Sequence, residues 1–289
     1  MDQTFSAIKQ IASDRSHGYH LPMTHHETWR QAFSSAGGMP LRWLSAWWRI
    51  IELGAIVVVL AVSPSSYRPR TQLAIARHMY MDTAPILAGF TVLCALLTLV
   101  ITRIVVVTSS SYGLSQYALE LVIRVLVLEL IPLTASLFVA LRCTIPNGAA
   151  LAEMRRHGQF ELIHGDGEDP VTAEVLPRVL AGVFTAITLA ALSCVVALSL
   201  AYLAVYGLSL AGVSAYTHMF GQVFKPAVVL IFVLKTLFFS LTVSVIPMAS
   251  ALYDLEGDGT RESAALQGLV RMFAVLLLIE AGSLVGNYY

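Results

Sequence analysis

The sequence predicts an all-α integral membrane protein, and its composition and the lengths of its apolar runs both indicate this class. Of the 289 residues, 57% are hydrophobic and 12% are charged, and the mean hydropathy is +0.73. A soluble globular domain carries about 25% charged residues, and a spanning helix needs about 20 mostly apolar residues. Several runs of that length follow one another, so we expect an N-terminal interfacial helix and five transmembrane helices.

The N-terminal part divides into a polar segment, residues 1–42, and a predicted interfacial (elbow) helix, residues 43–66. Trp43, Trp48 and Arg49 crowd the first turns of this helix, and such residues are typical of the lipid headgroup region. The apolar part is too short to cross a membrane unaided, although a sixth span at this place is the alternative. A secretory signal would begin with a basic stretch and an apolar core, which this N-terminus lacks.

Five apolar runs predict the transmembrane helices. Pro85 suits a first helical turn because its φ angle is already helical, so we expect the first span to begin there. Residues 108–116 and 207–223 then read as loops. The expected spans are residues 85–107, 117–141, 179–206, 226–252 and 264–284.

The distribution of basic residues predicts the orientation. Eight of the eighteen lysine and arginine residues precede Pro85, and four more lie in or beside the polar segment 153–170. Cytoplasmic loops carry the excess of such residues. We therefore expect a cytoplasmic N-terminus, a cytoplasmic segment 153–170 and a periplasmic C-terminus.

Charged side chains inside the apolar runs are the candidate functional residues, because charges in hydrocarbon are costly and usually mark a path or pocket. Glu129 and Lys235 lie about 20 Å and about 14 Å from the outer ends of their helices, within a core roughly 30 Å thick. They can pair or can face a cavity for a charged headgroup; the alternative is a buried pair that only fixes helix registry. Arg103 and Glu120 flank the same turn, which predicts a second buried ion pair.

The polar segment 153–170 is the most informative surface feature. It contains Arg155, Arg156, Gln159, Phe160 and Glu161. These residues predict a short helix on the membrane surface that docks into a soluble partner and transmits its movement. An ordinary solvated loop is the alternative.

The chain lacks the motifs of common catalytic sites. No GxxxxGK[ST] phosphate-binding loop, GxSxG elbow or HExxH motif occurs. The three cysteines form no CxxC pair, and the N-terminal histidines have no partnering carboxylate or cysteine pattern. We predict no catalytic residue, metal site or cofactor, and no nucleic-acid partner.

Seven short blocks together resemble those of the MlaE/YrbE-type permeases in order and approximate spacing. The resemblance covers roughly residues 80–289, which we take as the permease domain. The blocks are Leu128-Glu129-Leu130-Ile131-Pro132, Val139-Ala140-Leu141-Arg142, Ala152-Glu153-Met154, Gln159, Asp169-Pro170, Pro177-Arg178 and Leu234-Lys235.

The resemblance implies a membrane subunit, without its own ATPase site, of an ABC-type lipid transporter in the bacterial inner membrane. Its implied partners are a cytoplasmic ABC ATPase, an MCE-domain protein and a second permease copy or paralogue. Phospholipid is the implied substrate, bound by Glu129, Lys235 and Tyr112 at the positions that match the family's pocket. The segment 153–170 would be the coupling segment that touches the ATPase.

Departures from the family pattern mark a divergent member. Leu128 stands where the family usually has arginine, and Leu141 stands where it has glycine. In the coupling segment, Gly158 and His164 replace typical glutamates. Two other functions therefore stay open: a scaffold subunit that does not transport, and a secondary transporter that uses Glu129 and Lys235 as a proton-linked pair.

Overall fold

The computed structural model describes residues 25–165, 167–253 and 261–288, and every regular element in these ranges is helical. The predicted all-α class is confirmed. The chain divides into two compact units, Met1–Trp47 and Trp48–Tyr289, and the sites considered below lie in the second. Residues 1–24, which form most of the predicted polar segment, lie outside the described residues.

Among the described residues, six helical stretches are long and apolar enough to cross a membrane. Five of them overlap the five predicted spans, and the sixth belongs to α2 (His25–Val62), within the predicted interfacial helix. In α2, Ile50, Leu53 and Val57 are buried on one face. The six stretches are Leu44–Val62, Pro69–Ser111, Tyr117–Arg156, Val171–Tyr206, Pro226–Tyr253 and Leu266–Asn287.

The helix α3 (Pro69–Ser111) begins sixteen residues before the predicted start of the first span, so the expectation that Pro85 opens this helix was wrong. Pro69 occupies the first turn, and Pro85 lies inside the helix. The residues before Pro85 are partly polar, and some of them bond to neighbouring helices. Asp82 accepts a hydrogen bond of 2.9 Å from Asn147, and the hydroxyls of Thr83 and Thr185 lie 2.8 Å apart.

In the part of the chain that the structure describes, three π-helical segments interrupt the α-helices, and each ends two residues before a proline. A proline lacks the N–H for an α-helical bond, and its ring clashes with the carbonyl four residues earlier. A widened π-helical turn before the proline gives that carbonyl room, so that the helical stretch continues through the proline. The pairs are η3 (Ile123–Leu130) with Pro132, η4 (Ala140–Thr144) with Pro146, and η5 (Val171–Val175) with Pro177.

The remaining elements complete a bundle of long helices joined by short connections. Residues 207–223, which we expected to form a loop, contain the helix α9 (Val213–Val223). The other elements are η2 (Pro64–Ser66), α4 (Ser115–Val122), α5 (Ile131–Val139), α6 (Ile145–Arg156), α7 (Gln159–Gly165), α8 (Leu176–Tyr206), η6 (Leu210–Gly212), α10 (Pro226–Tyr253) and α11 (Arg261–Tyr288).

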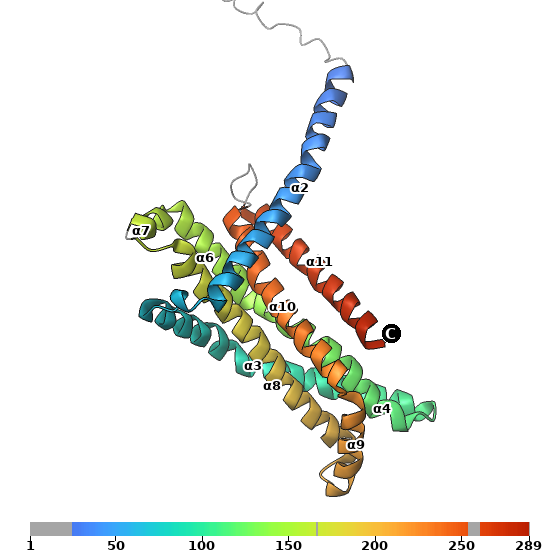
Figure 1. Cartoon of the computed structure of the whole chain (residues 1–289). Helices are drawn as coiled ribbons and strands as arrows, with labels where there is room; N and C mark the ends of the chain where they lie inside the picture. The colour runs from blue at the N-terminus through green and yellow to red at the C-terminus, as the bar shows by residue number, and fades with distance from the viewer. Residues whose placement is uncertain (1–24, 166, 254–260, 289) are drawn as a thin grey trace, which may run out of the picture. The chain divides into compact units, whose positions relative to one another are not determined.

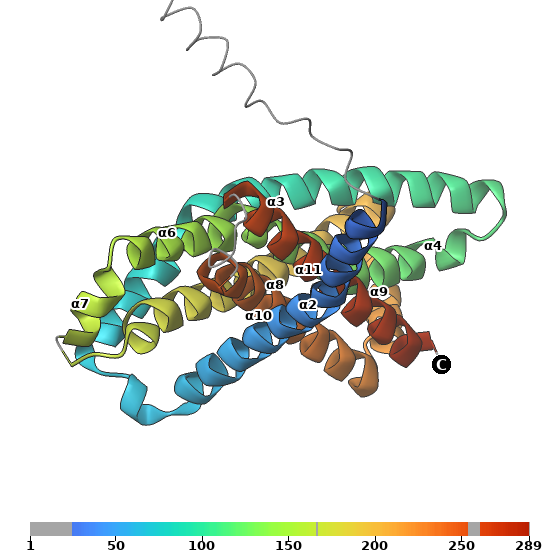
Figure 2. The same ribbon diagram turned by 90° about the horizontal axis from the view of Figure 1, so that it is seen from above.

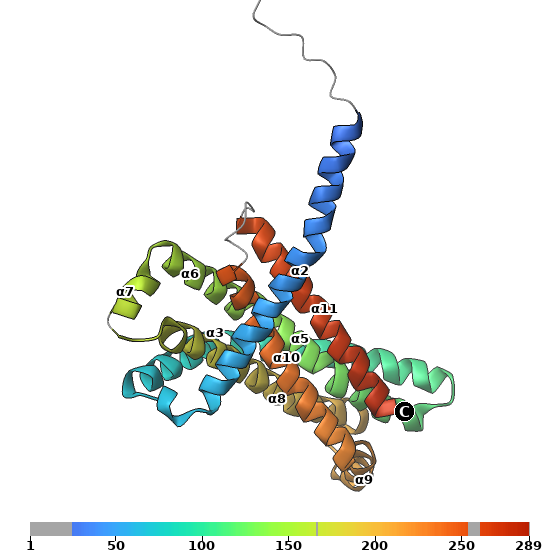
Figure 3. The same ribbon diagram turned by 45° about the horizontal axis from the view of Figure 1, so that its top comes forward.

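Within the unit Trp48–Tyr289, α3 packs along α8, and α10 lies among α6, α8 and α11 (Figure 1). Seen from above, α7 and the turn between α3 and α4 lie at opposite ends of the bundle (Figure 2). The end of α11 lies toward the α4 end (Figure 3). The described part of the coupling segment and the end of α11 are therefore on opposite sides.

The C-terminal half of α10 is tightly enclosed, since every residue from 242 to 250 is buried. Glycines on the neighbouring helices allow this close approach. A Cβ atom at Gly182 of α8 would lie 2.6 Å from Ser244 Oγ, and one at Gly268 of α11 would lie 2.8 Å from Ser250 Cβ. Small residues thus bring these two helices close to α10, as is common where helices pack in membranes.

Candidate functional site

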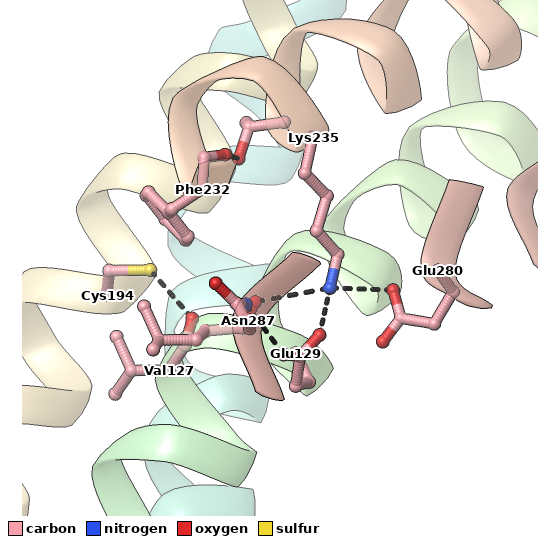
Figure 4. A network of polar contacts seen from close by, with 9 residues as sticks. Val127, Glu129, Cys194, Phe232, Lys235, Glu280 and Asn287 are labelled. Carbon is pink, nitrogen blue, oxygen red and sulfur yellow. Dashed lines mark hydrogen bonds and ion pairs between the residues drawn. The ribbon is translucent and has the colours of Figure 1, made fainter. Parts of the chain in front are cut away.

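Lys235 lies within the apolar helix α10, and only 3% of its surface is exposed. Three oxygen atoms surround its ammonium group (Figure 4). The carbonyl oxygen of Leu128 is 3.3 Å away, Glu280 Oε2 is 2.7 Å away, and Glu129 Oε2 forms the third contact. A lysine ammonium has three N–H donors, so the donors and the surrounding acceptors are equal in number.

The Leu128 carbonyl is available to Lys235 because of the local sequence. In an α-helix this oxygen would accept from the N–H of residue 132, but residue 132 is proline and has no N–H. The carbonyl of the preceding residue, Val127, is contacted by the Cys194 thiol at 3.7 Å. Donors from α10 and α8 therefore serve the backbone at the π-helical segment η3.

The two acids of the site come from separate segments. Glu129 lies in η3, and Glu280 lies on α11 together with Asn287, seven residues further on. This spacing puts both α11 side chains on one helix face, the face that also buries Leu276. The Asn287 amide donates to Glu129 Oε1 at 3.5 Å. We call Glu129, Lys235, Glu280 and Asn287 the buried ion cluster.

The electrostatics of the buried ion cluster are unbalanced, because two carboxylates face one ammonium group. With all three ionised, the cluster carries one net negative charge. The Phe239 ring lies 5.5 Å from the ammonium and adds a weak attraction for it. Charges in this position are costly to bury unless they are paired, so the contacts hold η3, α10 and α11 in one mutual register.

The structure brings Glu129 and Lys235 together, which their similar depths indicated. The sequence interpretation missed Glu280 and Asn287 as members of the site. Glu280 carried a usable signal, since it is an ionisable residue within an apolar run. Its partners could not be chosen from the sequence, because pairing depends on how α11 packs.

Tyr112 is not part of the cluster. It ends α3, is 77% exposed, and is separated from Glu129 by about 20 Å of helix.

The predicted Arg103–Glu120 pair was wrong. Glu120 accepts a hydrogen bond of 3.0 Å from Arg124, one turn along the same rod, and the pair is partly exposed rather than buried. The Arg103 side chain is exposed on α3. Glu120 can reach a partner four residues away on its own helix without two helices coming together. This explains why it pairs with Arg124 and not with Arg103.

The coupling segment forms a helical turn of its own. The helix α6 ends at Arg156, Gly158 adopts a positive φ of 68°, and α7 follows. The Asp169 carboxylate accepts the backbone N–H groups of Val171 and Thr172 at 3.3 and 3.2 Å and so caps the start of the next rod. A short helix with defined ends was the expectation for this segment.

The five predicted coupling residues divide into two groups. The Arg155 guanidinium donates to the Leu252 carbonyl at 2.7 Å and lies over the Tyr253 ring, while Phe160 packs against the core. Both are anchors. The other three, Arg156, Gln159 and Glu161, are exposed.

A cavity of about 470 Å³ lies beneath α7. Its walls are mainly apolar, with Arg155, Glu161 and His164 as the ionisable members. The full lining is Leu53, Arg155, Phe160, Glu161, His164, Pro170, Val171, Val175, Leu252 and Tyr253.

Metal ligation has no candidate in the described side chains. No group of three or more His, Cys, Asp or Glu residues there is arranged to hold an ion. Cys94, Cys143 and Cys194 are buried free thiols. The histidines at 17, 20, 25 and 26 lie outside the described side chains.

Comparison with known proteins gives one clear result. A family model described as "Permease MlaE" matches residues 75–284, well over half of the chain. The match includes the helical stretches that carry Glu129, Lys235 and Glu280, and also the segment 153–170. No curated protein matches the chain.

Proposed function

The chain belongs to the MlaE permease family, and on this premise we propose that it binds a phospholipid between its helices and couples to a separate ATPase. Members of this family are membrane permease subunits of ABC-type transporters. The finer proposal concerns the lipid, the residues that hold it and the route by which the ATPase acts.

The observation that carries the proposal is the meeting of Glu129 and Lys235 in a buried site formed by separate segments. Ionisable residues inside a membrane usually mark a substrate path. Here they are held by η3, α10 and α11, and the Glu129 and Glu280 side chains keep 10% and 15% of their surface exposed. A lipid headgroup that displaces one of these contacts would also loosen the packing of three helices.

The route to the ATPase follows one continuous rod. The stretch Tyr117–Arg156 carries Glu129 and leads directly into the coupling segment. Arg156, Gln159 and Glu161 are the exposed residues that would contact the partner, while Arg155 anchors the end of the rod to α10. A push on α7 would therefore reach both Glu129 and Lys235.

The wider assembly follows from family membership and from the topology. We place the chain in the bacterial inner membrane, with a second permease copy or paralogue and an MCE-domain protein as partners. The coupling segment and the end of α11 lie on opposite sides of the bundle. This arrangement supports a cytoplasmic coupling segment and a periplasmic C-terminus.

Lipid binding is tested by native mass spectrometry of the gently extracted complex. Glu129→Ala and Lys235→Ala should each lower the amount of bound lipid, since each removes a polar contact of the site. Lys225→Ala is the matched control, because Lys225 is exposed next to the start of α10. Unchanged lipid in both site variants would reject the pocket.

The scaffold alternative rests on the altered coupling residues and predicts a different result. If the subunit only holds the complex together, Arg156→Ala and Glu161→Ala will leave the ATPase rate of the complex unchanged. The proposed coupling role predicts a lower rate in both variants. A proton-linked transporter, in contrast, would move lipid in vesicles that contain the purified chain alone.

A further inference from the structure

The buried ion cluster contains acceptor oxygens that can take a further hydrogen bond. The three N–H donors of Lys235 face three oxygen atoms. The Asn287 Oδ1 atom is buried and has no hydrogen-bond partner in the described part of the chain. The Glu280 Oε2 atom is also buried and lies 2.7 Å from the Lys235 ammonium. Carboxylate and amide oxygens can accept more than one hydrogen bond, so the site can take a further donor.

The net charge of the buried ion cluster also favours a positively charged hydrogen-bond donor. With both acids ionised, two carboxylates and one ammonium leave one negative charge, and an unpaired buried charge is strongly unfavourable. A positive group placed beside Glu280 would remove this excess. A phosphate group would increase it, and Lys235 has no spare N–H with which to bind one.

Accessibility decides which atoms an incoming group meets first. The Lys235 side chain is 2% exposed, whereas those of Glu129 and Glu280 are 10% and 15% exposed. The reachable edge of the site is therefore made of carboxylate. One turn from Glu280, Ser283 is 8% exposed, and its Oγ is buried without a partner in the described residues. It supplies another polar atom on the same face of α11.

We propose that Glu280 is a specificity-determining residue of the lipid site, and that the site takes the primary ammonium group of a zwitterionic lipid headgroup. A primary ammonium brings one positive charge and three N–H donors. It can therefore meet Glu280, Glu129 and the Asn287 amide oxygen together. A quaternary ammonium brings the charge without donors, and the glycerol headgroup of phosphatidylglycerol brings hydroxyl donors without the positive charge.

This inference rests on the proposed function, and the experiment separates the two. The full chain, in the complex with which it copurifies, is placed in nanodiscs of equal parts phosphatidylethanolamine, phosphatidylcholine and phosphatidylglycerol. It is then extracted gently, and native mass spectrometry counts each retained lipid. The wild type should retain phosphatidylethanolamine roughly tenfold over phosphatidylglycerol, as expected for a charge-assisted hydrogen bond. Mono- and dimethylated phosphatidylethanolamine should fall in between, in the order of their remaining N–H groups.

The variant Glu280→Gln keeps the size of the side chain and one acceptor oxygen but removes the charge. It should reduce the preference to near parity while lipid is still retained. Glu120→Gln is the matched control, since Glu120 is paired with Arg124 outside the cluster, and it should keep the wild-type preference.

Other results would reject either the headgroup preference alone or lipid binding as well. Equal retention of the three lipids by the wild type would mean that a proton satisfies the spare acceptors, and the inference would fail while lipid binding stands. Preference for the anionic lipid, or an unchanged preference in Glu280→Gln, would also reject it. Absence of any retained lipid would reject the proposed function and the inference together.

Discussion

The Lys235 ammonium lies 3.3 Å from the carbonyl oxygen of Leu128, the backbone group that Pro132 leaves without an α-helical donor. The same relationship recurs on α10. Pro247 cannot donate to the Val243 carbonyl, and the Thr144 hydroxyl donates to that oxygen at 2.6 Å. In both places a side chain from another segment replaces the missing backbone bond. Prolines inside the membrane helices thus create specific contacts between helices.

Lys235→Met should destabilise the protein strongly. The substitution keeps the length of the side chain but leaves Glu129 and Glu280 buried without a cation, and removing one partner of a buried pair costs about 3–5 kcal/mol. Thermal unfolding in detergent, followed by circular dichroism, measures the effect. The triple variant Lys235→Met, Glu129→Gln and Glu280→Gln should recover much of the loss, because no charge is left unpaired. A triple variant no more stable than Lys235→Met would contradict the electrostatic explanation.

Thr144→Val should lower stability by about 1–3 kcal/mol, since the Val243 carbonyl would be buried without a donor. Thr144→Ser keeps the hydroxyl and should remain close to the wild type. The comparison uses the same unfolding measurement. A Thr144→Val variant as stable as the wild type, or a Thr144→Ser variant that loses as much stability as Thr144→Val, would contradict this role of the hydrogen bond.

Gly182→Ala should destabilise the contact between α8 and α10 by about 1–3 kcal/mol, the usual cost of an overfilled core. The added Cβ would lie 2.6 Å from Ser244 Oγ and 2.8 Å from Thr144 Cγ2. Gly221→Ala is the control, because nothing lies within 4 Å of its Cβ position. Similar melting temperatures for the two variants would show that the helices can separate without cost.

Arg155→Ala and Arg156→Ala should separate anchoring from docking. Arg155→Ala removes the bond to the Leu252 carbonyl and should lower stability by about 1–2 kcal/mol. Arg156 is exposed, so its removal should leave the melting temperature unchanged and reduce the amount of ATPase that copurifies. Quantitative gel analysis of the purified complex provides the second readout. Loss of stability in Arg156→Ala would place that residue among the anchors.

The class of the fold was predictable because the apolar runs exceed the length that hydrocarbon requires. The extent of α3 was not, since Arg77, His78 and Asp82 have the composition of a loop. Their helical state depends on contacts such as Asn147 with Asp82, which the sequence does not reveal. The same holds for α9, whose aromatic residues pack on α8: the Tyr216 hydroxyl donates to the Leu198 carbonyl at 3.0 Å.

The candidate site was predictable in part. Glu129 and Lys235 stood out because charges in apolar runs are rare, and their depths followed from the helical rise. Glu280 has the same property, but its pairing with Lys235 depends on how α11 packs. The role of Pro132 was hidden, because a freed carbonyl becomes meaningful only when a donor from another helix is seen to reach it.

The widened turns η3 and η4 also determine which way the coupling residues face. Each adds to the residue count of the rod that runs from Glu129 to Arg156. Loss of a single amino acid between these two positions would turn everything beyond it by roughly 100° about the rod axis. A natural or engineered insertion or deletion between Glu129 and Arg156 would therefore turn the Arg156 side chain to another direction, even if every other side chain were kept.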